Sequence, residues 1–393
     1  MKYRTVRLMA AAVATTCVMM AATCHAADES HGRHIVNEAV RPAMEKYDIP
    51  GMAVGIAVDG ASYIFNYGVA SRETRKPVDA ATLFEIGSIS KTFTVTLASL
   101  AEVEGHLSWS DKTSQYLPSM KDTPFGDVRL LYLATHTPGG FPLQLPDDVT
   151  NDAQLTAYLE HWKPAYKAGT MRTYANPSIG MLGRIAARSM DGDFAALMEH
   201  RIFAALGLSG TYLHVPKSRM PDYAQGYTKR DEPARMTEAV LSSEAYGVRS
   251  TASDMLRFLT ANMGQLPLQP ALQRAITATH TSYFRAGVLT QDLIWEQYDE
   301  PVALDTLLRG NSSEMAYNAT PAAPLIPPQA PRADAWINKT GSTNGFGAYV
   351  AFIPERRLAI VLLANKNYPN DARVALAHEI LSRLARKNGS PSD

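Results

Sequence analysis

The start of the chain combines a helical pattern of apolar residues with two strand-like runs. Apolar positions recur three and four apart over residues 34–47, which predicts a helix. Two β-rich runs follow at 52–58 and 61–69, and the Asp59-Gly60 pair between them is a strong hairpin signal. We therefore predict a helix followed by a β-hairpin.

The end of the chain shows the same two elements in the opposite order. The runs 348–353 and 357–364 flank Pro354-Glu355-Arg356 and predict a second hairpin, and a helical pattern follows over 371–386. A two-stranded hairpin is barely stable alone in water. We therefore expect both hairpins to share one antiparallel sheet, covered by the terminal helices.

The middle of the chain is predicted to be mostly helical. Helical spacing recurs near 88–104, 152–162, 177–190, 193–206 and 252–264. The stretch 320–332 contains five prolines, so we predict an extended surface loop there rather than a regular element.

These patterns predict an α+β fold (an α/β-type sandwich) of two lobes. Residues 27–83 and 305–393 would form the sheet lobe, and residues 84–304 a mostly helical inserted lobe with the active site between them. The chain has 393 residues, of which 46% are hydrophobic. That is enough to build a large core.

The first 26 residues differ from the rest. Lys2, Arg4 and Arg7 precede an apolar run over 8–23, and the small residues Ala26-Ala27 follow. This order is typical of a secretory signal peptide over residues 1–26, cleaved near Ala26, and it predicts a periplasmic protein. The short run disfavours a permanent membrane span, and we expect no stable span after processing.

Charge and cysteine content exclude several classes of function. The formal net charge is +0, so the chain lacks the basic surface of a nucleic-acid-binding protein. Both cysteines, Cys17 and Cys24, lie in the signal peptide, so the exported protein would have no disulfide and no cysteine nucleophile. The ten histidines form no metal-binding pattern, and we predict no metal site.

A serine followed three residues later by a lysine, Ser88 and Lys91, stands at the head of a predicted helix. Residues three apart share one face of a helix, so the amine can reach the hydroxyl. A serine needs a neighbour that takes its proton before it becomes a good nucleophile. The helix N-terminus adds free N–H groups where an oxyanion would form. An isolated lysine of this kind is usually solvated, so the pair needs support from other motifs.

Two further motifs lie far from this pair in sequence. Tyr174-Ala175-Asn176 precedes a helical run, and Lys339-Thr340-Gly341-Ser342 opens the C-terminal hairpin. With the Ser-x-x-Lys pair, they resemble the three signature elements of the serine β-lactamase and penicillin-binding protein superfamily. Tyrosine in the middle element resembles the class C β-lactamases, and the likeness runs over about residues 35–385.

The resemblance implies a reaction and its catalytic residues. Ser88 would form an acyl-enzyme with a β-lactam, preferentially a cephalosporin, and the N–H groups of Ser88 and Ser342 would hold the oxyanion. Tyr174, coupled to Lys91 and flanked by Lys339, would act as general base. A free phenol has a pKa near ~10, but two cations within about 4–6 Å favour the phenolate. Family members of this kind need no cofactor, and we expect a monomer.

The resemblance also implies a substrate-binding set. Asn176 and Gln144 would face the side-chain amide of the substrate, Asn176 would also orient Lys91, and Tyr246 would form a wall of the pocket. The substrate carboxylate would be received by residues from the last motif and from the final helix, namely Thr340, Gly341, Asn370 and Arg373. Arg373 would be the electrostatic partner of the carboxylate, either directly or through Asn370.

Other interpretations remain open for each residue and for the function. Tyr174 could be a packing tyrosine, Lys339 could belong to a charged turn, and Arg373 could pair with Asp371 or Glu379. His136 is predicted to be structural. A penicillin-binding carboxypeptidase or related serine esterase would use the same serine, lysine and tyrosine, but would release β-lactams slowly. A non-catalytic β-lactam sensor would need a membrane tether.

Overall fold

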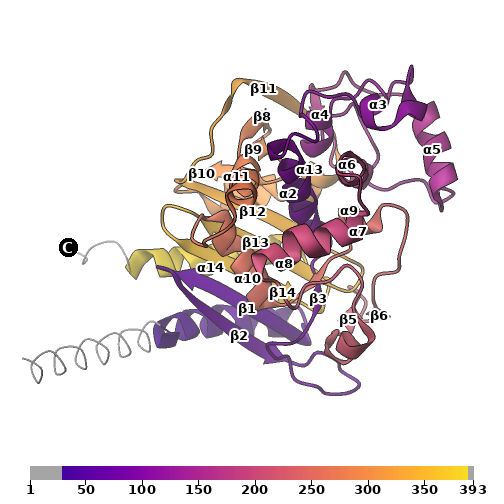
Figure 1. The fold of residues 1–393 in the computed structure, drawn as a ribbon. Coiled ribbons are helices and arrows are strands. Elements are labelled where there is room, and N and C mark those ends of the chain that lie inside the picture. The colour runs from indigo at the N-terminus through magenta and orange to yellow at the C-terminus, as the bar shows by residue number, and fades with distance from the viewer. Residues whose placement is uncertain (1–28, 388–393) are drawn as a thin grey trace, which may run out of the picture.

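The computed structural model describes residues 29–387, which fold around a ten-stranded antiparallel sheet (Figure 1). The strand order is β2-β1-β14-β13-β12-β10-β9-β8-β11-β4. The strands are β1 (Gly51–Val58), β2 (Ala61–Gly68), β4 (Met171–Arg172), β8 (Ser282–Ala286), β9 (Leu289–Asp292), β10 (Glu296–Asp299), β11 (Thr320–Gln329), β12 (Ala335–Ser342), β13 (Gly347–Ile353) and β14 (Leu358–Ala364). Two short pairs lie apart from it: β3 (Phe84–Glu85) with β7 (Arg249–Ser250), and β5 (Gly226–Tyr227) with β6 (Pro233–Ala234).

The two terminal hairpins meet in the sheet, as the sequence predicts. β1 pairs with β14, and Met52 lies opposite Ala364. Successive side chains of a strand point to opposite faces. Ala53 accordingly joins the core on one face, whereas Val54 and Ile56 join the core on the other. Because both faces are covered, β1 and β14 are apolar throughout instead of alternating with polar residues.

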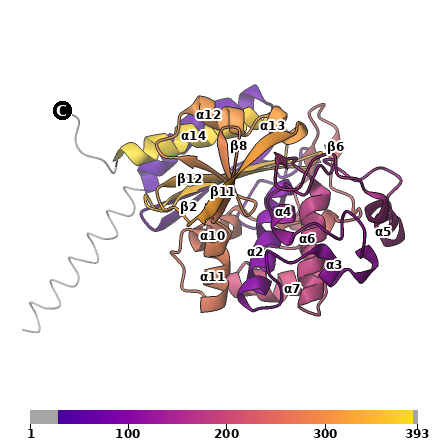
Figure 2. The same cartoon turned by 90° about the horizontal axis from the view of Figure 1, so that it is seen from above.

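Helices cover both faces of the sheet (Figure 2). The helix over residues 29–46, α12 (Leu304–Gly310) and α14 (Asn370–Lys387) belong to one face, and α10 (Ala252–Asn262) packs on the other. The remaining α-helices are α2 (Ser90–Val103), α3 (Thr113–Tyr116), α4 (Leu130–Ala134), α5 (Asp152–His161), α6 (Asn176–Ser189), α7 (Phe194–Leu197), α8 (Ala204–Leu206), α9 (Ser242–Ala245), α11 (Pro270–Ala278) and α13 (Ser313–Tyr317). The predicted α+β fold is confirmed, with α2 and α6 packed together in the helical lobe.

The prediction of a loop at 320–332 is wrong, because Thr320–Gln329 form strand β11. β11 lies near the edge of the sheet and pairs with β8 from Ala322 to Pro324, after which the register shifts. Proline cannot donate a ladder hydrogen bond, so a proline-rich strand is tolerated only at an edge or an irregularity. Residues 282–299, which we placed in the helical lobe, also contribute three strands to the sheet.

Two predictions concern the ends of the chain. The signal peptide, its cleavage position and both cysteines lie outside the described residues. Within residues 29–387, none of the helices is both long enough and apolar enough to cross a membrane.

Candidate active site

Ser88 lies in a short 3-10 turn, η1 (Gly87–Ile89), which leads directly into α2. Gly87 has a φ of +53°, and a Cβ there would lie 2.5 Å from the backbone nitrogen of Ser342. Only glycine fits both the left-handed backbone and this close approach. The turn and the end of β12 therefore meet at the half-buried Ser88, and the predicted oxyanion partners are brought together.

Lys91 extends from the first turn of α2 toward Ser88. Its Nζ donates hydrogen bonds to Ser88 Oγ at 2.9 Å and to the carbonyl oxygen of Ala245 at 2.8 Å. The lysine is fully buried, and burial lowers the pKa of Lys91 to about 8. The predicted Ser-x-x-Lys contact is therefore present, with an amine that gives up its proton more readily than an exposed lysine.

Tyr174 lies between the two motif lysines. The Nζ atoms of Lys91 and Lys339 lie 5.3 Å and 4.9 Å from the centroid of its ring. Burial alone would raise the pKa of Tyr174, but the charges of Lys339 and Lys91 outweigh it and lower that pKa to about 8. The nearby Ser88 hydroxyl also favours the phenolate, although within residues 29–387 the buried Tyr174 hydroxyl has no partner in strict hydrogen-bond geometry.

The ring of His136 packs against Tyr174, a contact that we did not predict. The ring centroids of His136 and Tyr174 are 4.4 Å apart. His136 Nδ1 accepts the N–H of Ala175 at 3.3 Å, and its carbonyl oxygen accepts the N–H of Thr173 at 2.8 Å. Burial lowers the pKa of His136 well below its usual value, so the ring is neutral at pH 7. His136 therefore holds the loop that carries Tyr174, in keeping with the structural role predicted for it.

A buried ion pair lies near the Tyr174 ring. The Arg172 guanidinium carbon is 5.5 Å from the centre of the Tyr174 ring, and Arg172 Nη2 is 2.7 Å from Glu296 Oε1. Arg172 Nε also donates to Gln291 Oε1 at 2.7 Å. Both charged side chains are almost fully buried. Sequence reasoning missed this pair because its members lie 124 positions apart and belong to none of the three motifs.

The predicted amide-recognition pair is in contact, but one of its predicted roles is wrong. Asn176 Nδ2 donates to Gln144 Oε1 at 2.9 Å. We expected Asn176 to orient Lys91 as well. Instead its Oδ1 makes no hydrogen bond to any described residue, and the non-catalytic partner of Lys91 is the Ala245 carbonyl.

The other predicted binding residues lie around the ends of β12, α9 and α14. Thr340 is half-buried on β12, and its carbonyl oxygen accepts from Lys339 Nζ at 3.2 Å. Tyr246 directly follows α9 and is half-buried. Asn370 begins α14 and donates to the carbonyl oxygen of Asn311 at 2.7 Å. Its buried Oδ1 has no hydrogen-bond partner in the described part of the chain.

Arg373 is fully buried against the end of β12. Its Nη1 donates to the Gly341 carbonyl oxygen at 2.8 Å and to Ser342 Oγ at 2.7 Å. Burial lowers the pKa of Arg373 to about 10. In residues 29–387 it forms no ion pair with Asp371 or Glu379. The geometry favours an indirect role, in which Arg373 holds the end of β12 beside Ser88.

The assembled site combines a nucleophile with basic groups. Ser88, Lys91, Tyr174, Lys339 and Ser342 converge from three separate segments of the chain. Over residues 29–387, no group of His, Cys, Asp and Glu side chains could hold a metal ion. A serine beside an amine and a phenol of lowered pKa is suited to acyl transfer.

Known proteins match the chain over nearly its whole length. Residues 36–385 match the family described as Beta-lactamase. A beta-lactamase of Lysobacter lactamgenus is 51% identical over 346 residues, covering 88% of this chain and 90% of that protein. The solved structure of D-alanine carboxypeptidase AmpC from Burkholderia cenocepacia is 55% identical, with a TM-score of 0.87 over 90% of this chain and 99% of that one. A class C beta-lactamase in complex with cefoxitin is 48% identical, with a TM-score of 0.88 over 91% and 99%.

Proposed function

The chain belongs to the beta-lactamase family, as a serine hydrolase related to its class C members, and from that premise we propose how its cleft opens a β-lactam. Ser88 Oγ attacks the carbonyl carbon of the lactam. As the new C–O bond forms, the serine proton passes to the Tyr174–Lys91 pair. The ring C–N bond then breaks, and the same proton moves to the departing nitrogen, which leaves an acyl-enzyme ester on Ser88.

Electrostatic stabilisation supplies the second part of the mechanism. The backbone N–H groups of Ser88 and Ser342 donate to the carbonyl oxygen as it gains negative charge. Each donor of this kind typically contributes about 3 kcal/mol. The close approach of Gly87 to Ser342 supports this role, because it fixes the distance between the two segments before the substrate arrives.

Hydrolysis of the ester completes the cycle. Tyr174 takes a proton from a water molecule, the water oxygen attacks the ester carbon, and the C–Oγ bond breaks as Ser88 regains its proton. A base of pKa near 8 suits this step, because near neutral pH it combines an accessible phenolate with adequate basicity. Tyr174 and Lys91 share the proton as a coupled unit.

The single observation that carries the proposal is the position of Tyr174 between two buried lysines, with one of them bonded to Ser88. Recognition follows from the surrounding residues. Gln144 and Asn176 bind the side-chain amide, Tyr246 forms a wall, and Thr340 and Asn370 receive the carboxylate, with Arg373 behind them. We further propose that cephalosporins are preferred and that the protein acts in the periplasm after its signal peptide is removed.

Turnover of a chromogenic cephalosporin tests this function. Sustained hydrolysis over many turnovers per enzyme is expected, and mass spectrometry with a slow β-lactam should find one adduct on Ser88 that is absent in Ser88→Ala. A single stoichiometric burst followed by no further hydrolysis would overturn the proposal of a β-lactamase.

One observation favours a second candidate, a D-alanine carboxypeptidase. The Burkholderia cenocepacia protein that is 55% identical to this chain carries that name. The same nucleophile and base could cleave a peptide ending in D-alanyl-D-alanine, with the terminal carboxylate in place of that of a β-lactam. Release of D-alanine from such a peptide at a rate comparable to cephalosporin turnover would support this second activity.

A further inference from the structure

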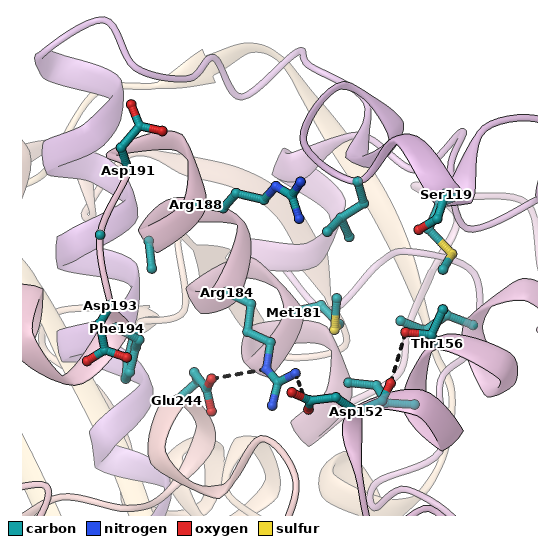
Figure 3. Close-up of a pocket in the computed structure, with 16 residues that line it drawn as sticks. Ser119, Asp152, Thr156, Met181, Arg184, Arg188, Asp191, Asp193, Phe194 and Glu244 are labelled. Carbon is teal, nitrogen blue, oxygen red and sulfur yellow. Dashed lines mark hydrogen bonds and ion pairs between the residues drawn. The ribbon is translucent and has the colours of Figure 1, made fainter.

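A solvent-open cavity of about 830 Å³ lies in the helical lobe between α5, α6 and α9 (Figure 3). Arg184 of α6 lies in its wall between two carboxylates. Arg184 Nη1 is 2.6 Å from Asp152 Oδ1, and Arg184 Nε is 3.3 Å from Glu244 Oε1. The two acids differ sharply, because 77% of the Asp152 side chain is exposed, against 9% for Glu244.

The backbone of Glu244 and of the next residue is hydrogen-bonded to the helix that carries Lys91. Its carbonyl oxygen accepts a hydrogen bond from Thr94 Oγ1 at 2.6 Å, and the next carbonyl, that of Ala245, accepts from Lys91 Nζ at 2.8 Å. Both donors lie on α2. The short helix α9, only four residues long, is therefore attached to the catalytic helix through its backbone and to α6 through the Glu244 side chain.

We propose that Arg184 is a positioning residue for Lys91, because it fixes Glu244 and thereby the Ala245 carbonyl that holds Lys91 Nζ beside Ser88. This inference rests on the proposed role of Lys91 in acylation.

The physical reason is the burial of Glu244. A buried carboxylate is tolerated only when it is paired, and removal of its partner leaves an uncompensated charge. Arg184 is the only residue that forms an ion pair with Glu244 in the described part of the chain. Without Arg184, Glu244 would turn toward the water in the cavity. Because α9 is a single helical turn, we expect that movement to shift Ala245 as well, whose carbonyl oxygen accepts the hydrogen bond from Lys91 Nζ.

Asp152 provides a matched control on the same guanidinium. It bonds Arg184 at the shorter distance, but it is exposed, and among residues 29–387 its own segment, the start of α5, forms no hydrogen bond or ion pair with Lys91. An exposed ion pair contributes little. Arg184→Ala should slow acylation by about tenfold, because small displacements of a catalytic group are costly. Asp152→Asn should change it by less than about twofold.

The test is a double-mutant cycle on the acylation rate, followed by mass spectrometry with a slow β-lactam. Wild type, Arg184→Ala, Lys91→Ala and the double variant are compared. If Arg184 acts through Lys91, its effect disappears once Lys91 is alanine. If the tenfold loss persists in that background, Arg184 acts elsewhere and the positioning role is overturned. If Lys91→Ala acylates at the wild-type rate, the proposed function of Lys91 fails, and the positioning role fails with it.

Two further measurements separate positioning from folding. The melting temperature identifies a variant that is simply unstable, and Arg184→Met, which keeps a long side chain without charge, replaces Arg184→Ala in that case. Added methylguanidinium should restore acylation in Arg184→Ala through the open cavity, but not change the wild-type rate. Absence of rescue, in a folded variant that has lost acylation, would show that the charge beside Glu244 is not what positions Lys91.

Discussion

The residues beside Ser88, namely Lys91, Tyr174 and Lys339, form what we call the inner end of the site, and the predicted binding residues Gln144, Asn176, Thr340 and Asn370 form its rim. Lys91 and Lys339 are fully buried against Tyr174, whereas Gln144 is exposed and Thr340 is half-buried. The inner residues are fixed before any substrate arrives, by a packed histidine ring behind Tyr174 and by hydrogen bonds on Lys91.

The rim has the opposite character. Asn176 and Asn370 each leave a buried side-chain oxygen without a hydrogen-bond partner among residues 29–387. A buried polar atom without a partner is unfavourable and is satisfied when a ligand or water supplies the missing group. We infer that the inner end serves the proposed proton transfer, whereas the rim keeps hydrogen-bonding capacity for a substrate.

Ser88→Ala should cause the largest loss. Removal of the nucleophile prevents the acyl-enzyme, so kcat should fall by about 10⁶-fold. Stopped-flow hydrolysis of a chromogenic cephalosporin measures this, and binding of the intact substrate is the control. Retention of more than a few per cent of turnover would contradict the assignment of the inner end as the reacting centre.

Tyr174→Phe should come next. The ring and its packing against His136 are kept, and only the hydroxyl is lost. General-base catalysis typically contributes 10²–10⁴-fold, so we expect kcat to fall by about 10³-fold. An unchanged kcat would mean that Lys91 alone moves the proton. Tyr67→Phe, far from the cleft in β2, is the control and should have no effect on kcat.

Gly87→Ala tests whether the inner end depends on backbone contact. The new Cβ would lie 2.5 Å from Ser342 backbone atoms in a left-handed conformation, so we expect destabilisation by about 3 kcal/mol. Gly105 is the matched control, because it also has a positive φ but has nothing within 4 Å of its Cβ position. Gly105→Ala should cost only about 1 kcal/mol. Equal effects in urea unfolding would refute a special contact at Gly87.

Lys339→Met should shift the pH dependence of kcat. Lys339 lowers the pKa of Tyr174, so its removal raises that pKa. The proposed mechanism needs the phenolate, so the rate rises with pH through this pKa. The rising, low-pH part of the pH–rate profile should therefore shift to higher pH by about one unit, and activity at pH 7 should fall. The pH–rate profile measures the shift. Movement of this part of the profile to lower pH would contradict the proposed sign.

Substitutions at the rim should have the smallest effects. In the proposed binding mode, Gln144→Ala and Asn370→Ala would each remove one hydrogen bond to substrate, worth about 0.5–1.5 kcal/mol. We expect KM to rise up to about tenfold while kcat changes little, since the base is untouched. Steady-state kinetics on a cephalosporin measure both constants. A fall in kcat with unchanged KM would place these residues in the proton-transfer machinery instead.

The sequence predicted the parts of the molecule that depend on local spacing. The Ser88–Lys91 contact follows from helical periodicity, and the pairing of β1 with β14 follows from two hairpins that need partners. The Arg172–Glu296 pair and the packing of His136 were missed, because tertiary contacts between distant segments leave no periodic signal. β11 was missed because its many prolines predict a loop, and the sequence does not show that the segment lies near the edge of a sheet, where prolines are tolerated. The burial of Arg373 was missed because an arginine in the polar first turn of a helix is usually exposed.

Titration of Tyr174 is the sharpest test of its proposed role as the general base. Burial raises the pKa values of several other tyrosines, among them Tyr67, Tyr246 and Tyr349, so a low-pKa tyrosine stands apart in an ultraviolet absorbance titration. We predict that one phenol ionises near pH 8 in the wild-type protein and that this transition is absent in Tyr174→Phe. If the wild-type and Tyr174→Phe titrations coincide up to pH ~9, where an ordinary phenol begins to ionise, Tyr174 is not the base.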